Sequence, residues 1–228
     1  MENQMDFEKD TPAPERVLII GAHADDAVLG CGGTIVKYTL ESRDVYLCLA
    51  TRAYTPDWSP EYVANQMKEL EESNRVLGIK KTFYLNYPAA RLDTVPQKEL
   101  NDTLWRVINE LKPQLIYVND GDDLNADHRL LFESALVATR PINGYIKRVL
   151  SYSTSEWGPI RVPFSPNVYV NITGTFDCKI KAMQCFASEI RPYPHPRSPE
   201  IIKALAEKRG SEAGVALAEA FRLIREVI

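Results

Sequence analysis

Two short clusters of histidine and aspartate hold the side chains of this sequence that are best suited to chemistry. The first, His-Ala-Asp-Asp at 23–26, directly follows an apolar, β-branched run at 16–20. The second, Asp-His at 127–128, follows the apolar run at 115–118. Open α/β sheets present reactive groups where buried strands end and helices begin. Imidazoles and carboxylates at such an edge indicate a metal site.

The glycines after the first cluster, Gly30, Gly32 and Gly33, raise the alternative of a nucleotide-binding loop. Their order, G-C-G-G, lacks the G-x-G-x-x-G pattern that opens directly from a strand. The adjacent carboxylates Asp25 and Asp26 would also repel a pyrophosphate. Helix capping explains one aspartate at a helix start, but not two together with a histidine. The residues alone therefore favour a metal or catalytic site.

Length and composition set the broad class of the protein. The chain has 228 residues, 45% of them hydrophobic, which suits a single α/β domain over 1–228 with a flexible N-terminal segment at 1–14. The net charge of -4 and the lack of a polybasic run argue against a nucleic-acid partner. We find no apolar run long enough for a membrane span and no secretory signal. The four cysteines lack C-x-x-C spacing, so we expect reduced thiols in a cytoplasmic protein.

Strands and helices are predicted to alternate along the chain. The expected strands are 16–20, 44–50, 82–85, 115–118, 147–152 and 167–172, and 218–225 forms a final amphipathic strip or strand. The expected helices are 34–41, 60–78, 97–111, 127–139, 175–189 and 199–209. Three prolines between 191 and 198 predict an extended segment there. The pattern predicts a Rossmann-like, mostly parallel twisted sheet flanked by helices, with the active site at the carboxyl ends of the strands.

The two clusters also resemble the motifs of a known family. Residues 22–34, A-H-A-D-D-A-V-L-G-C-G-G-T, resemble the A-H-P-D-D-E-x-x-G-C-G-G motif of the PIG-L/LmbE-like family of zinc-dependent N-deacetylases. Residues 123–128, D-L-N-A-D-H, resemble the second metal motif of that family, and later blocks extend the resemblance from 16 to 225. The resemblance implies hydrolysis of the acetamide of an amino sugar, in a GlcNAc-type glycoside or a nucleotide sugar.

The resemblance also implies roles for the residues of the two clusters. One Zn²⁺ per chain, or another divalent transition metal, would be held by His23, Asp26 and His128, which leaves a position open for water. Asp25 stands at the position of the general base. Asp127 would orient a ligand imidazole.

Two departures from the family pattern affect the expected chemistry. Ala27 replaces a frequent glutamate. Asn125 stands where other members have a histidine credited as general acid, and an amide cannot shuttle a proton. We therefore expect His195, the third histidine of the chain, to act as the acid. The alternative is that His195 has a structural role, packed between prolines, and that Asp25 returns the proton it took. The residues expected to contact substrate are Asn125, Arg52 and Arg197.

The sequence leaves some alternatives open. A catalytically impaired metal- or sugar-binding protein of the same fold would retain these motifs without the activity. The predicted partner is a small amino-sugar substrate, and a homo-oligomer is also open.

Overall fold

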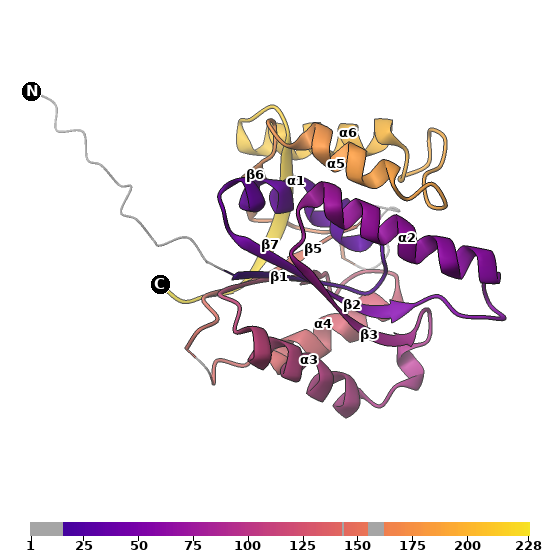
Figure 1. Cartoon of the computed structure of the whole chain (residues 1–228). Coiled ribbons are helices and arrows are strands. Elements are labelled where there is room, and N and C mark those ends of the chain that lie inside the picture. The colour runs from indigo at the N-terminus through magenta and orange to yellow at the C-terminus, as the bar shows by residue number, and fades with distance from the viewer. Residues whose placement is uncertain (1–15, 143, 155–161) are drawn as a thin grey trace, which may run out of the picture.

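The computed structural model describes residues 16–142, 144–154 and 162–228 (Figure 1). The predicted flexible segment at 1–14 lies outside these ranges, as does S-E-W-G at 155–158, one of the later blocks that resemble the family.

The described residues form a seven-stranded sheet in the order β3-β2-β1-β4-β5-β7-β6. The strands are β1 (Arg16–Gly21), β2 (Asp44–Arg52), β3 (Lys81–Pro88), β4 (Leu115–Asn119), β5 (Arg148–Tyr152), β6 (Val168–Asn171) and β7 (Ala218–Glu226). The first five strands run parallel, while β7 runs antiparallel to its neighbours β5 and β6. This confirms the predicted Rossmann-like, mostly parallel sheet.

Helices cover both faces of the sheet (Figure 1). The helices are α1 (Asp26–Leu40), α2 (Pro60–Leu77), α3 (Gln97–Leu111), α4 (Ala126–Ala138), α5 (Phe176–Gln184) and α6 (Pro199–Ala213), with a 3₁₀ turn, η1, at Leu92–Thr94. Successive residues of β1 point to opposite faces. Val17 and Ile19 therefore pack with α1, α2, α5 and α6, whereas Leu18 and Ile20 pack with α3 and α4. The sheet is thus buried on both faces.

The first helix begins eight residues earlier than the predicted start at Thr34, and the three glycines lie inside it. A Cβ at Gly30 would lie 2.1 Å from the Tyr152 ring, and one at Gly33 would lie 2.8 Å from Ile172. These glycines let α1 pack closely on neighbouring elements. The prediction missed this because glycine is otherwise a poor helix former.

The C-terminal region differs from prediction at three places. Helix α5 ends at Gln184 rather than near residue 189. The segment 191–198 forms turns instead of the predicted extended segment, because the carbonyls of Pro192 and His195 each accept a backbone hydrogen bond from three residues ahead. Helix α6 continues past Gly210 to a left-handed cap at Gly214. Gly210 is a packing position, since a Cβ there would lie 2.5 Å from the carbonyl oxygen of Ala216.

The ends of other helices follow their sequence signals. The Ser59 hydroxyl caps α2 by accepting a hydrogen bond from the Tyr62 N–H at 3.2 Å, and Gly78 ends the helix at a φ of 77°. Helix α3 has the predicted bounds. None of the helices in the described ranges combines the length and apolar character needed to cross a bilayer.

Candidate metal centre

The two histidine–aspartate clusters meet at the point where the strand order reverses. From β1 the chain proceeds outward to β2 and β3, and from β4 it proceeds to β5 on the other side. Such a reversal leaves a crevice at the carboxyl edge of a parallel sheet, where ligands bind. His23 and Asp26 lie between β1 and the first turn of α1, and His128 lies in the first turn of α4. The fold therefore brings together residues that are 105 positions apart.

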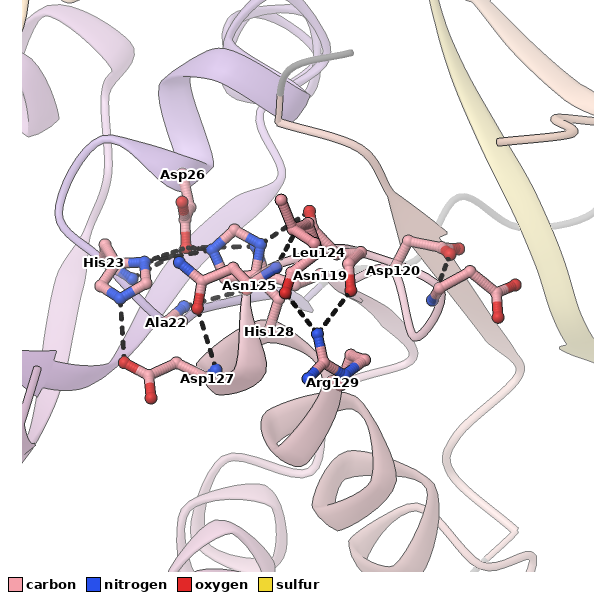
Figure 2. A network of polar contacts seen from close by, with 12 residues as sticks. Ala22, His23, Asp26, Asn119, Asp120, Leu124, Asn125, Asp127, His128 and Arg129 are labelled. Atoms are coloured by element: carbon pink, nitrogen blue, oxygen red, sulfur yellow. Dashed lines mark hydrogen bonds and ion pairs between the residues drawn. The ribbon is translucent and has the colours of Figure 1, made fainter. Parts of the chain in front are cut away.

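Three predicted ligands converge on one small volume (Figure 2). Nδ1 of His23 lies 3.1 Å from Nε2 of His128. Oδ2 of Asp26 lies 3.6 Å from the first nitrogen and 3.3 Å from the second. The remaining nitrogen of each ring faces a carboxylate: Nε2 of His23 lies 3.0 Å from Asp127, and Nδ1 of His128 lies 2.8 Å from Asp123. Metal-binding histidines characteristically use their second nitrogen in this way, so the donor set fits a divalent metal.

The charges of the site favour a cation. Burial lowers the pKa of His23, but the hydrogen bond to Asp127 and the charge of Asp26 outweigh it and raise the pKa to about 10. Burial likewise lowers the pKa of His128, and the charge of Asp26 and the bond to Asp123 raise it to about 9. Despite its burial, Asp26 has a pKa well below its usual range because of the two imidazoles. The site thus concentrates negative charge around two ring nitrogens.

A family model described as GlcNAc-PI de-N-acetylase, PIG-L, matches residues 18–139, which is more than half of the chain. The chain belongs to the PIG-L family. Two curated relatives align over most of their own length. The uncharacterized deacetylase YaiS of Escherichia coli is 26% identical over 74% of this chain and 88% of YaiS. The diacetylchitobiose deacetylase of Thermococcus kodakarensis is 25% identical over 97% of this chain and 88% of that protein.

Solved structures share the fold over nearly the whole chain. The N,N'-diacetylchitobiose deacetylase from Pyrococcus horikoshii has a TM-score of 0.77 and 25% identity, and the match covers 93% of this chain and 84% of that one. The conserved protein TT1542 from Thermus thermophilus has a TM-score of 0.76 and 26% identity, covering 93% and 96%. The hydratase GalB from Pseudomonas putida reaches 0.76 at only 18% identity, covering 94% and 98%. The fold alone therefore does not identify the reaction.

In this PIG-L chain, Asp25 contacts Arg197, whereas its neighbour Asp26 contacts the two histidines. Asp25 occupies the N-cap position of α1, yet its side chain makes no capping hydrogen bond within the described part of the chain. Its Oδ2 lies 2.9 Å from Nη2 of Arg197. Burial raises the pKa of Asp25, the Arg197 guanidinium lowers it and the Asp26 charge raises it, for a result of about 6. The side chain is thus a buried carboxylate that can take up a proton near neutral pH.

Arg197 is itself held by a chain of contacts that reaches α2. Nη1 of Arg197 lies 2.5 Å from Glu189. The other oxygen of Glu189 accepts a short hydrogen bond from the Tyr62 hydroxyl, and Gln66 donates to that hydroxyl at 3.1 Å. The network fixes the position of the guanidinium beside Asp25. The predicted contact residue Arg197 therefore lies at the site.

The remaining predicted site residues are Asn125, His195 and Arg52, and each lies in a different part of the structure. Asn125 caps α4, because its Oδ1 accepts a hydrogen bond from the Asp127 N–H at 2.9 Å. His195 is half-buried, and its Nδ1 accepts from the Arg197 N–H at 3.1 Å. Burial, together with Arg197 and Arg191, lowers the pKa of His195.

Arg52 is exposed at the carboxyl end of β2. Its backbone carbonyl accepts a hydrogen bond from the Ala89 N–H at 3.1 Å. Its predicted contact with substrate stays a prediction.

Two residues of the centre were given no role from the sequence: Asn119, and Asp123 at the start of the second motif. Nδ2 of Asn119 donates to Asp26 at 3.1 Å, and its Oδ1 accepts from the Ala22 N–H at 2.9 Å. Asn119 thereby links β4 to the loop after β1. The carboxylate of Asp123 contacts Nδ1 of His128, the ring nitrogen that faces away from the metal site. Asn119 could have been noticed in the sequence, because it is a polar residue at the end of a wholly buried strand.

Proposed function

We propose that the protein is a zinc-dependent N-deacetylase that hydrolyses the acetamide of an N-acetylated amino sugar or its glycoside. Membership of the PIG-L family and the names of the diacetylchitobiose deacetylases support the reaction. The observation that carries the proposal is the convergence of His23, Asp26 and His128, with Asp25 beside them and turned to its own partner. Three protein ligands with an open position suit catalysis rather than a closed structural site.

The roles of the ligands follow from their contacts. His23, His128 and Asp26 would hold one metal ion per chain, with Asp127 and Asp123 fixing the two rings. When bound, Zn²⁺ polarises a carbonyl group and lowers the pKa of a water molecule toward about 7.

Asp25 would act as the general base. Its pKa of about 6 leaves the carboxylate largely ionised at neutral pH, so it can accept a proton from the attacking water. Arg197 keeps the carboxylate charged and correctly oriented.

The departing amine requires a proton, and His195 is the predicted donor. Because Nδ1 accepts a hydrogen bond from the backbone, the neutral ring carries its proton on Nε2. The lowered pKa makes the protonated ring a stronger acid than free histidine. Asp25, protonated in the first step, is the alternative donor. Asn125 is a contact residue in this scheme, since its amide can form hydrogen bonds but cannot transfer a proton.

Metal analysis with a deacetylation assay tests the proposal. The purified protein should contain about one zinc per chain and release acetate from N-acetylglucosamine or N,N'-diacetylchitobiose. Asp25→Ala should keep the metal and lose roughly a hundredfold or more in rate, whereas His128→Ala should lose the metal. A metal-replete wild type that hydrolyses no N-acetyl sugar would favour an impaired binding protein of the same fold.

His195→Gln separates the two candidate acids. If His195 is the acid, the variant should keep its metal, lose roughly a hundredfold in rate and lose the basic limb of its pH–rate profile. An unchanged rate and profile would assign the acid role to Asp25.

A further inference from the structure

Two loops at the carboxyl edge of the sheet flank the metal centre. The loop after β2 follows Thr51 and Arg52 at the end of the strand, and the N–H and hydroxyl of Thr51 both donate to the carbonyl of Ala22, next to His23, at 3.0 and 2.6 Å. The loop after β3 places the N–H groups of Ala90 and Leu92 on Asp127, at 2.6 and 3.0 Å. Both loops are therefore anchored beside a metal-binding residue or its carboxylate partner.

Side chains from these loops form a cluster that we call the rim platform: Tyr54, Asp57, Trp58 and Arg91. The rings of Tyr54 and Trp58 meet edge to face, with centroids 5.6 Å apart. The guanidinium carbon of Arg91 lies 5.4 Å from the centre of the Tyr54 ring. Asp57 accepts from the Tyr54 hydroxyl at 2.6 Å and from Arg91 at 3.2 Å. The contacts give these four side chains a defined arrangement.

Core packing does not account for the two aromatic rings of the platform. Neither Tyr54 nor Trp58 belongs to the hydrophobic clusters that the described residues form. Both rings are half-buried, and Asp57 and Arg91 are exposed. Aromatic faces combined with a few fixed polar groups are characteristic of ligand sites.

The charges of the platform indicate the kind of ligand. Arg91 is paired with Asp57 and lies against Tyr54, so the platform offers no unbalanced positive charge. A phosphate or pyrophosphate is bound best by guanidinium groups free to make paired hydrogen bonds. An uncharged sugar instead presents C–H groups to an aromatic face and hydroxyls to a carboxylate and a guanidinium. The platform therefore suits a neutral saccharide.

We propose that the rim platform is a subsite for a second, neutral sugar ring of the substrate, with Trp58 as the stacking surface and Asp57 and Arg91 as hydroxyl partners. The inference rests on the proposed deacetylase function. It selects a neutral oligosaccharide over a phosphate-bearing or nucleotide-linked sugar. Arg91 lies between the two residues that hold Asp127, so a ligand on the platform lies next to the metal centre.

Steady-state kinetics of the zinc-loaded enzyme on four substrates tests the proposal. The substrates are N-acetylglucosamine, N,N'-diacetylchitobiose, N-acetylglucosamine 1-phosphate and UDP-N-acetylglucosamine. The wild type should prefer the disaccharide. Trp58→Ala should lower kcat/KM for the disaccharide by roughly tenfold, through KM, and leave the monosaccharide unchanged. Trp105→Ala, which removes an exposed ring from α3, is the matched control and should change neither.

A second variant tests the charge argument. Asp57→Asn removes the partner of Arg91 and frees its guanidinium, so kcat/KM for the two phosphorylated substrates should rise several-fold relative to the disaccharide. Equal losses on mono- and disaccharide in Trp58→Ala, or a wild type that prefers UDP-N-acetylglucosamine, would overturn the subsite. A wild type inactive on all four substrates would instead reject the proposed function. Quenching of Trp58 fluorescence by N,N'-diacetylchitobiose, absent in Trp58→Phe, would then still report whether the platform binds sugar.

Discussion

The two histidines of the metal centre are supported by carboxylates of very different kinds. Asp127 is buried and accepts hydrogen bonds from His23 and from two backbone N–H groups of the loop after β3. Asp123 is more exposed, at 15% of its side chain against 2%, and supports His128 from within the same short loop. Asp127 therefore ties together segments far apart in sequence, whereas Asp123 organises only its neighbours. The support of His23 by Asp127 therefore depends on the completed fold, whereas the support of His128 by Asp123 is local.

Asn125 connects the two supports. Its N–H donates to Asp123 at 2.8 Å, and its Oδ1 accepts from the Asp127 N–H at 2.9 Å. The D-L-N-A-D-H segment is thus a single hydrogen-bonded unit. Asp127 is directed at His23, as Figure 2 shows, and Asp123 contacts His128.

The largest effect is expected from Asp127→Asn. The change removes the charge that orients His23 and places an amide group against backbone N–H donors, so zinc affinity should fall by about a hundredfold. Competition with a chromophoric chelator would measure it. An affinity within twofold of the wild type would show that the buried support is not required.

A smaller effect is expected from the matched change Asp123→Asn. Because Asp123 lies in a more solvated loop, we expect zinc affinity to fall by about tenfold. The same chelator titration applies. Equal losses in the two variants would mean that burial does not distinguish the two supports.

Arg197→Gln tests whether the pKa of the general base, Asp25, can be changed without affecting the two carboxylates that support the histidines. Arg197 lowers the pKa of Asp25, so its removal should raise that pKa. The base must be ionised, and the acidic limb of the pH–rate profile should therefore move up by about one pH unit. Zinc content should stay unchanged. An unchanged pH–rate profile would show that Arg197 does not control the pKa of the general base.

The smallest effect is expected from Asn125→Ala. Loss of the N-cap of α4 should cost about 1 kcal/mol of unfolding free energy, measured by urea denaturation of the zinc-loaded protein. A matched Asn101→Ala change on α3, which removes no cap, is the control. A loss of rate well beyond the loss of stability would indicate a direct role for the Asn125 amide with substrate.

Local signals predicted most of the fold. Apolar runs located the parallel strands, and Ser59 and Gly78 marked the ends of α2, because these features depend on nearby residues. The predicted start of α1 was wrong because Gly30 and Gly33 lie inside the helix to leave room for Tyr152 and Ile172, which are distant in sequence. The turns at 191–198 were missed for a similar reason, since proline excludes a helix there but permits both turns and extended chain.

The site could be predicted to the level of residue types. Histidine and aspartate at two strand ends indicated the metal set, and the structure brings those residues together. The pairing of Arg197 with Asp25 and of Tyr62 with Glu189 could not be read from the sequence. Arginine, glutamate and tyrosine are common surface residues, and their pairing depends on how the C-terminal region docks on α2. The catalytic roles remain predictions.

The position of β1 beside β4 has a consequence for how the chain folds. A partly folded chain with only β1 to β3 paired would hold His23 and Asp26 but not His128, so tight metal binding requires the pairing of residues 105 positions apart. Contacts over such long separations form late, since closing the intervening chain costs entropy. Metal uptake would then report the completion of the central sheet, and chelation should lower the melting temperature of the whole protein, since the ion binds only the native state.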